Sequence, residues 1–326
     1  MSVTIEAREV TKIFPVAKGI FSKKHYIRAV DRVSLGIREN EIVALVGESG
    51  CGKSTLGRLL LGLIKPTEGK ILYMGKDIWS LKGREYEEFR RNAQLIPQDP
   101  YSALNPMKNI LSQLTPPLLK YKIARNRKEA VKRAAELLEL VGLVPPEDFF
   151  KRFTCRLSGG QLQRISIARA ISVQPKFIVA DEAVSMLDAS LRIEILDILL
   201  NLQRKFKTAY LFITHDLAIA RYFAREGRTA IMYLGNIVEI GETENVIQKP
   251  LHPYTQVLIQ AVPVPDPDLA AKRGLPKLRS LEIPSLINPP PGCKFNTRCP
   301  YAEKICEEKV PELREVKGRL VACHLY

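Results

Sequence analysis

The sequence predicts an α/β protein with a largely parallel sheet, followed by a small region of irregular structure. Short apolar runs typical of buried strands alternate with stretches of helical periodicity, which is the pattern of a parallel sheet with crossover helices. Eleven of the 22 prolines lie between residues 250 and 300. Proline removes backbone donors and fixes φ, so we expect only short regular elements there and a boundary at about residues 250–260.

The predicted elements follow one another along the chain. Residues 41–46 form a short apolar run that ends at a glycine and are expected to be a buried strand, and the Leu-rich stretch after Ser54 is expected to be a helix. Apolar residues at helical spacing predict another helix over residues 125–141. The other expected elements are strands at 177–180, 209–213 and 230–233 and a helix at 190–206.

Length and composition place the chain among ordinary globular proteins. With 326 residues and 46% hydrophobic content, it can bury one large core with an appendage, or two smaller cores. The longest aliphatic run, residues 59–64, is too short to span a bilayer. The N-terminal segment lacks the apolar core of a secretory signal, so a cytoplasmic protein is expected.

The formal charge of +15 first suggests nucleic acid or an anionic membrane surface as a partner. The basic residues are spread out, and the densest cluster runs from Lys120 to Arg133. We interpret this cluster as a solvated helix face, with contact to lipid headgroups or a membrane partner as the alternative. No nucleic-acid motif with interleaved aromatic residues is present, so no nucleic-acid partner is expected.

Residues 47–54, Gly-Glu-Ser-Gly-Cys-Gly-Lys-Ser, match the phosphate-binding P-loop pattern, with a strand expected before them and a helix after them. Glycines let backbone N–H groups face inward around the β- and γ-phosphates, Lys53 adds positive charge, and the Ser54 hydroxyl can ligate Mg²⁺. The nucleotide-binding residues predicted here are Gly47, Glu48, Ser49, Gly50, Cys51, Gly52, Lys53, Ser54 and Thr55.

A second apolar strand, at residues 177–180, leads into two carboxylates, Asp181 and Glu182. Asp181 is predicted to hold Mg²⁺ through water, as in the Walker-B arrangement, and Glu182 to polarise the attacking water. The alternative is that these are two solvated carboxylates at a strand end. The P-loop in the same chain favours the catalytic interpretation over this alternative.

Residues 157–161, Leu-Ser-Gly-Gly-Gln, form a small-residue turn with exposed backbone donors ahead of an expected helix, which makes a second anion site. Such a site suits two chains that sandwich ATP between them. Here the sequence resembles the ABC ATPase family, whose hallmark is this motif. The resemblance implies a head-to-tail dimer with two ATP molecules at its interface. The motif residues assigned to nucleotide are Ser158, Gly159, Gly160 and Gln161.

The same resemblance implies the P-loop NTPase fold of an ABC ATPase domain, with a parallel-sheet core, an antiparallel β portion and an inserted helical subdomain at about 99–175. The family usually has proline after the Walker-B glutamate, where this chain has Ala183. Alanine removes no catalytic group, so we expect activity to survive this difference.

Further residues match family positions in order along the chain. Gln98 resembles the Q-loop glutamine that contacts Mg²⁺ and water, and Asp188 ends a segment that resembles the interface-crossing D-loop. His215 resembles the switch histidine that contacts the γ-phosphate. Phe14 matches the aromatic position that stacks on adenine, and Tyr26 is a competing candidate because residues 15–26 look like an insertion.

Longer stretches resemble the dipeptide/oligopeptide importer ATPases, a subfamily that also serves nickel and oligosaccharides. The matching stretches, which extend over nearly the whole chain, include 47–63, 98–106, 252–255 and the ending from 290 to 324. The resemblance implies a peripheral ATPase on the cytoplasmic face of the cell membrane, beneath two transmembrane permease subunits served by an extracytoplasmic solute-binding protein. Residues 15–26 and the Leu-Gly-Arg after the P-loop look like the second of two paired ATPases, so the expected ATPase partner is a related chain.

Four of the six cysteines, Cys293, Cys299, Cys306 and Cys323, crowd the C-terminal end with the spacing C-x5-C-x6-C-x16-C. In a reducing cytoplasm such a cluster first indicates metal ligation. Zinc sites usually show closer pairs, and the proline after Cys299 also occurs in ferredoxin-type runs. The resemblance implies a structural [4Fe-4S] cluster, with zinc or unmetallated cysteines as the alternatives.

These features predict an ABC ATPase domain at residues 1–255 and a proline-rich C-terminal extension at 256–326. The predicted function is hydrolysis of ATP coupled to uptake of di- and oligopeptides, with oligosaccharides or nickel as alternative solutes. A soluble ABC ATPase acting on nucleic acid or ribosomes is a second class, but such proteins commonly carry two cassettes or coiled-coil inserts. A third class, an iron–sulfur electron carrier with a vestigial ATPase, disagrees with the intact set of ATPase residues.

Overall fold

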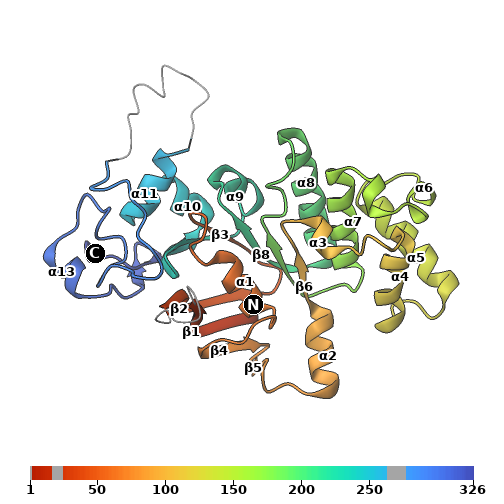
Figure 1. Ribbon diagram of the computed structural model, residues 1–326, viewed down its shortest axis with the longest axis horizontal. Helices are drawn as coiled ribbons and strands as arrows, with labels where there is room; N and C mark the ends of the chain where they lie inside the picture. Colours follow the sequence, from red (N-terminus) through yellow and green to blue (C-terminus); the bar gives the residue numbers. More distant parts are fainter. Residues whose placement is uncertain (1, 17–24, 263–276) are drawn as a thin grey trace. The chain divides into compact units, whose positions relative to one another are not determined.

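The computed structural model describes residues 2–16, 25–262 and 277–326 (Figure 1). The chain folds into two compact units that are interleaved along the sequence. Unit 1 comprises Met1–Ile5, Gly36–Glu41 and Leu72–Ile213, and unit 2 comprises Glu6–Leu35, Ile42–Ile71 and Thr214–Tyr326. Each unit therefore gathers segments that are far apart in sequence.

Unit 2 contains five strands in the order β11 (Arg314–Val316), β12 (Arg319–Val321), β10 (Asn236–Glu242), β9 (Arg228–Tyr233) and β3 (Ile42–Val46). The first four pair antiparallel, and β9 pairs parallel to β3. Strands β3 and β9 are almost entirely buried, as expected of short apolar runs in the interior of a sheet.

Three longer strands, mostly in unit 2, form a second sheet in the order β2 (His25–Arg38), β1 (Val3–Val16) and β4 (Glu68–Tyr73). Alternate residues of β2 from Val33 to Ile37 are buried, which is the period of a strand with one covered face. The helices of unit 2 are α1 (Lys53–Leu60), α9 (Leu217–Phe223), α10 (Thr243–Gln248), α11 (Pro253–Gln260) and α13 (Lys304–Glu308).

Unit 1 contains the parallel strands β6 (Ala93–Ile96), β7 (Phe177–Asp181) and β8 (Ala209–Thr214, whose last residue belongs to unit 2). Strands β7 and β8 are buried along their whole length. A short strand, β5 (Lys76–Asp77), pairs antiparallel with the end of β4. The mixture of parallel and antiparallel pairing confirms the predicted fold class.

The helices of unit 1 are α2 (Gly83–Asn92), α3 (Pro100–Ala103), α4 (Ile110–Lys120), α5 (Arg127–Leu140), α6 (Glu147–Phe150), α7 (Gly159–Ile171) and α8 (Ala189–Phe206), with the 3₁₀ turn η1 (Thr154–Arg156). Helix α5 packs against α4 and α7, and the three lie together in the yellow and green part of Figure 1. Helix α5 buries Ala130, Ala134, Leu137 and Leu138 and exposes its basic residues, an arrangement that fits both interpretations of the basic cluster.

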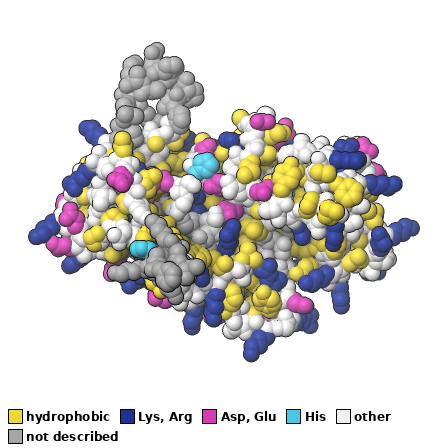
Figure 2. Space-filling model, in the orientation of Figure 1, with side chains coloured by type: hydrophobic (Ala, Val, Ile, Leu, Met, Phe, Trp, Pro, Cys, Tyr) yellow, Lys and Arg dark blue, Asp and Glu magenta, His cyan; other side chains and the backbone are white. Residues whose placement is uncertain are grey.

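Lysine and arginine side chains are spread over the face of the molecule seen in Figure 2 rather than gathered in one patch. Among the helices that the structure describes, none combines the length and the apolar composition needed to cross a membrane.

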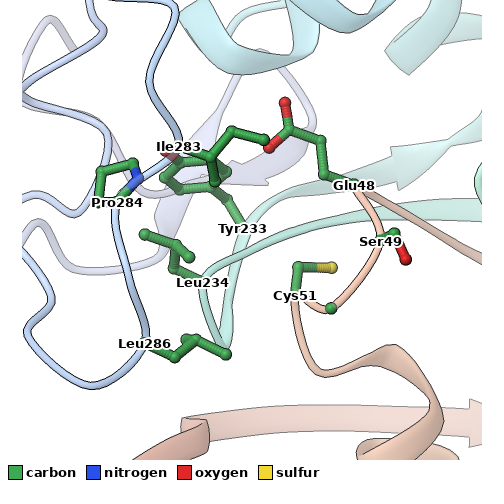
Figure 3. A pocket seen from close by; sticks show the side chains of 9 residues that line it. Glu48, Ser49, Cys51, Tyr233, Leu234, Ile283, Pro284 and Leu286 are labelled. Carbon is green, nitrogen blue, oxygen red and sulfur yellow. The ribbon is translucent and has the colours of Figure 1, made fainter.

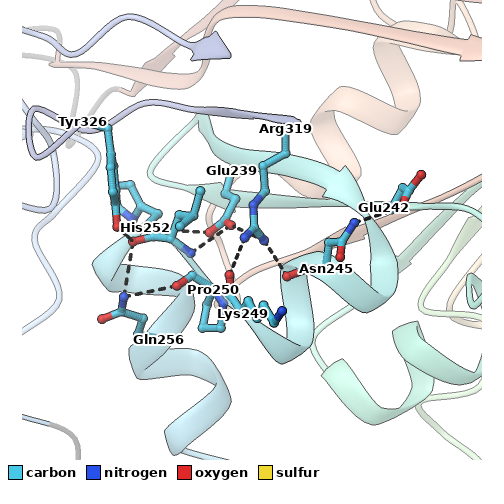
Figure 4. A network of polar contacts seen from close by, with 10 residues as sticks. Glu239, Glu242, Asn245, Lys249, Pro250, His252, Gln256, Arg319 and Tyr326 are labelled. Carbon is cyan, nitrogen blue, oxygen red and sulfur yellow. Dashed lines mark hydrogen bonds and ion pairs between the residues drawn. The ribbon is translucent and has the colours of Figure 1, made fainter. Parts of the chain in front are cut away.

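The C-terminal extension has little regular structure, as its prolines predict. Residues 277–303 contain neither helix nor strand. A buried ion pair between Arg319 of β12 and Glu239 of β10, 3.2 Å apart, attaches its end to the preceding sheet (Figure 4). Glu239 is fully buried and also accepts the backbone N–H groups of Leu251 and His252. Because a broken buried pair leaves an uncompensated charge, losing either partner is expected to cost about 3–5 kcal/mol.

His252 makes stability depend on pH. Its side chain is buried, accepts the Tyr254 N–H at the start of α11, and burial lowers its pKa from 6.5 to about 3. Below about pH 6.5 this histidine is therefore protonated in the unfolded chain but stays neutral in the folded protein. As a result, the free energy of unfolding falls by about 2 kcal/mol between about pH 6.5 and pH 5.

Replacing His252 by Asn keeps an acceptor at the start of the helix and removes the titration. Denaturant unfolding of both proteins at neutral and mildly acidic pH should show a smaller loss of stability for His252→Asn. Equal losses in the two proteins would contradict the role given to this histidine.

Candidate functional site

The segment from Gly47 to Gly52 joins β3 to α1 and leaves no room for side chains at two of its glycines. A Cβ on Gly47 would lie 2.1 Å from the carbonyl oxygen of Met232, and one on Gly52 would lie 2.1 Å from that of Ala29. Gly52 also has a φ of +108°, which L-residues rarely adopt. The loop therefore packs backbone against backbone, as the P-loop pattern predicts.

Lys53, at the start of α1, is buried and folds back over the loop. Its ammonium donates to the carbonyl oxygens of Gly47 at 2.8 Å and Glu48 at 2.9 Å, and lies 3.9 Å from Cys51 Sγ. Gly52, at the N-cap of α1, has no side chain to cap the helix. A positive charge and a helix N-terminus without a side-chain cap make this loop suited to a phosphate group.

A cavity of about 190 Å³ lies beside the loop, lined by residues 48–51, by Tyr233 and Leu234, and by Ile283, Pro284 and Leu286 of the C-terminal extension (Figure 3). Ligand pockets usually measure about 300–1,000 Å³. The cavity is therefore smaller than a typical ligand pocket, and we do not assign the nucleotide to it. Its lining shows that the extension reaches the loop.

In unit 1, the predicted catalytic carboxylate and the predicted Q-loop glutamine are in contact. Glu182 follows directly after Asp181, the last residue of β7. Gln98 Nε2 donates to Glu182 Oε2 at 2.9 Å. The backbone of Glu182 has a φ of +47°, and its N–H donates to the carbonyl oxygen of Ile213 at 3.0 Å. Such strained non-glycine positions cluster at functional sites.

The Leu-Ser-Gly-Gly-Gln motif forms the start of α7. Ser158 Oγ accepts the backbone N–H of Gln161, and Gln161 Oε1 accepts the N–H of Ser158, so the two residues make a capping box. Nothing lies within 4 Å of a Cβ built on Gly159. The capping box holds the turn in shape while Ser158 and Gly159 remain exposed to the solvent.

The remaining predicted residues of the ATP site belong to different elements of the two units. Asp188, the exposed N-cap of α8, follows a loop that Arg192 holds by donating to the carbonyl oxygens of Leu187 and Ser185. His215 is exposed directly after β8. Phe14 is half-buried in β1, with the Lys12 ammonium 5.1 Å from its ring centre.

The choice between Phe14 and Tyr26 for adenine stays a prediction. Tyr26 is 58% exposed in β2. Most of the segment 15–26, which the sequence indicates as an insertion, lies outside the described residues.

The four C-terminal cysteines occupy a buried region of unit 2. Cys299, Cys306 and Cys323 are buried, Cys293 is half-buried, and the Cys293 N–H donates to the Cys306 carbonyl oxygen at 2.8 Å. Burial, with a smaller contribution from the neighbouring thiols, raises the pKa of Cys293 to about 12. Within the described part of the chain, no three His, Cys, Asp or Glu side chains are placed to hold a metal ion. Neither of the two metal sites predicted for these cysteines is therefore confirmed.

Two residues beside the phosphate-binding loop had no predicted role. Tyr254 Oη accepts the Glu48 backbone N–H at 3.0 Å, and Arg298 donates to the Glu48 carboxylate. Both lie in stretches that resemble the importer ATPases, 252–255 and 290–324, but nothing in the local sequence pattern connects them to a loop more than 200 residues earlier.

Comparison with protein families gives two matches. The family described as ABC transporter matches residues 30–185, and the family described as Oligopeptide/dipeptide transporter, C-terminal region, matches residues 238–306. Similar full-length proteins include the oligopeptide transport ATP-binding protein AppF of Bacillus subtilis, 43% identical over 99% of this chain and 97% of that protein. The di/tripeptide transport ATP-binding protein DppF of Pseudomonas aeruginosa is 40% identical over 99% of this chain and 98% of that protein.

Among solved structures, the dimeric ATP-binding cassette MJ0796 bound to ADP and phosphate is similar, with a TM-score of 0.63 and 31% identity. The similarity covers 73% of this chain and 98% of that chain.

Proposed function

This chain belongs to the family of ABC transporter ATP-binding proteins of the oligopeptide/dipeptide type, and we propose that it couples ATP hydrolysis to the import of di- and oligopeptides. The observation that carries the hydrolytic part is the contact between Gln98 and Glu182 directly after the strand that ends in Asp181. The peptide substrate is supported by the family of the C-terminal region and by similar proteins named for oligopeptide and di/tripeptide transport.

In this proposal the loop at residues 47–54 binds the phosphates of ATP. Its backbone N–H groups and Lys53 surround the β- and γ-phosphates, and the exposed His215 contacts the γ-phosphate from the end of β8. Phe14 stacks on the adenine. The loop geometry supports these roles. At Gly47 and Gly52 the backbone lies so close to neighbouring carbonyl groups that no side chain would fit.

Mg²⁺ would be held by Ser54, Asp181 and Gln98, whose hydroxyl, carboxylate and amide oxygens are the hard ligands that this ion prefers. When bound, the ion supplies neutralisation of phosphate charge. Glu182 orients and polarises the attacking water, and its bond to Gln98 fixes one carboxylate oxygen so that the side chain has a defined direction. Ala183, in place of the usual proline, is buried and removes no catalytic group.

The Ser158–Gln161 turn would bind the nucleotide held by a second ATPase. Its exposed Ser158 and Gly159 at the start of a 13-residue helix support an anion site that faces outward. Asp188 would contact the partner across the same interface. We propose a related chain as the second ATPase, on the resemblance of the segments at 15–26 and after the P-loop to the second of two paired ATPases.

The other proposed partners are two transmembrane permease subunits and an extracytoplasmic solute-binding protein, with this chain at the cytoplasmic face of the membrane. The ATPase domain would extend to about residues 250–260, the region of α11, and the extension would follow. The helical subdomain at about 99–175 would comprise α3 to α7 and pass movement to the permeases.

For the four cysteines we propose a [4Fe-4S] cluster in preference to zinc. Cys293, Cys299 and Cys306 belong to one buried cluster of side chains, and none of the six described cysteines forms a disulfide. Burial and, to a smaller extent, the neighbouring thiols raise the pKa of Cys293, Cys299 and Cys323, so these side chains lie near other cysteines of the set. A bound cluster would act as a structural staple for a segment with few regular elements.

Replacing Glu182 by Gln should lower ATP turnover by roughly 10²–10⁴-fold while ATP binding persists, because the amide cannot polarise water as a carboxylate does. Steady-state hydrolysis and equilibrium binding of ATP measure the two effects. Turnover close to that of the wild type would remove Glu182 from this role.

Isolation of the native complex from membranes through this chain should recover two permeases, a second ATPase and a solute-binding protein. The ligand of that binding protein, identified by mass spectrometry, should be a peptide. Recovery of ribosomes or nucleic acid without a permease would instead favour the soluble class of ABC ATPase.

Protein purified without oxygen should contain about four iron atoms per chain and show the visible absorption of an iron–sulfur chromophore. Replacing both Cys299 and Cys306 by Ser should remove the iron, whereas Cys155→Ser, at an exposed cysteine elsewhere in the chain, should retain it. Anaerobic wild-type protein without iron would exclude the cluster.

A further inference from the structure

The C-terminal extension touches the phosphate-binding loop through an ion pair. Arg298 Nη1 lies 3.0 Å and 3.1 Å from the two carboxylate oxygens of Glu48, the second residue of the loop. The side chains of Arg298 and Glu48 are only 6% and 23% exposed. Because water screens such a pair poorly, the interaction is stronger than that of a surface ion pair.

Aromatic side chains hold the Arg298 guanidinium in place. The group lies 5.9 Å and 5.8 Å from the ring centres of Tyr233 and Phe295. Tyr233 in turn packs against Tyr254 and Phe295, with ring centres 4.5 Å and 5.3 Å away. Cation–π contact and the close rings leave Arg298 few alternative positions.

A second ion pair fixes the same segment at its other end. Lys294 Nζ lies 2.8 Å from Asp31 Oδ2 and donates to the Leu234 carbonyl oxygen at 3.0 Å. These two side chains are 11% and 16% exposed. Lys294 and Arg298 are sequence neighbours of Cys293 and Cys299, so the segment 293–299 carries both ion pairs between two of the four cysteines.

Glu48 has a different partner for each of its polar groups. Its N–H donates to Tyr254 Oη at 3.0 Å, its carbonyl oxygen accepts from Lys53 Nζ at 2.9 Å, and its carboxylate accepts from Arg298. Because the Lys53 ammonium rests on the Glu48 carbonyl, the conformation of Glu48 affects the position of the charge that would bind phosphate.

The sign of the Glu48 charge matters as well. A carboxylate in the phosphate-binding loop repels the triphosphate of ATP unless a cation offsets it. We infer that Arg298 is a positioning residue of the nucleotide site, which orients Glu48 and offsets its charge, so that the C-terminal extension completes the phosphate-binding loop. This inference rests on the proposed binding of ATP at residues 47–54.

The test measures the Kd for ATP with Mg²⁺ on the full chain, and KM and kcat for ATP in the purified transporter. Arg298→Ala should weaken ATP binding about tenfold and raise KM more than it lowers kcat. Arg298→Lys retains the positive charge and should lose less of the affinity for ATP than Arg298→Ala does. Adding Glu48→Gln to Arg298→Ala should recover most of the affinity, because no unneutralised carboxylate then faces the nucleotide.

Lys304→Ala is the matched control, since Lys304 belongs to the same extension and makes only an exposed ion pair at 3.9 Å with Glu308. It should bind ATP as the wild type does. Wild-type affinity for ATP in Arg298→Ala would overturn the inference. It would also be overturned if Arg298→Ala and its combination with Glu48→Gln bound ATP equally weakly, because Arg298 would then only support the fold. A wild-type chain that does not bind ATP, or a Lys53→Ala variant that binds it normally, would overturn the proposed function instead.

Discussion

The phosphate-binding loop depends on close backbone contact with the end of β9 and with the turn that joins β9 to β10. Gly47 lies against the Met232 carbonyl group, and the Gly235 N–H donates to the Cys51 carbonyl oxygen at 2.9 Å. This contact is available because β3 and β9 pair parallel, so that their carboxyl ends meet at one edge of the sheet. A side chain at Gly47 would separate the two, and the loop would lose the shape that directs its N–H groups and Lys53 toward a phosphate.

The same turn is where the C-terminal extension docks. Leu234 accepts a hydrogen bond from Lys294, and Tyr233 packs against Phe295 and Arg298. One short turn therefore contacts the nucleotide loop on one side and the extension on the other. The extension is therefore more than a loosely attached surface segment. Each buried charge of its two ion pairs loses hydration and is stabilised only by a well-placed partner.

The sequence predicts the strongly apolar and strongly patterned parts of the structure. Strands β3, β7, β8 and β9 and helices α1, α5 and α8 lie where short apolar runs or helical spacing indicate them, and the site motifs are readable because their chemistry is local. The long strands β1 and β2 were not predicted, because their polar residues interrupt the alternation of apolar and polar positions that marks a strand. The contacts of Gln98 with Glu182 and of Glu48 with Arg298 join residues 84 and 250 positions apart, and no local pattern encodes such pairs.

The irregular extension is also the part that most needs external attachment. Without helix or strand over residues 277–303, its backbone gains little from its own hydrogen bonds, and the entropy of ordering it must be offset by contacts with the rest of unit 2. The pairs of Lys294 with Asp31, Arg298 with Glu48 and Arg319 with Glu239 supply those contacts at three separate points. Because Glu48 is a residue of the phosphate-binding loop, its pair with Arg298 connects the four-cysteine region directly to that loop.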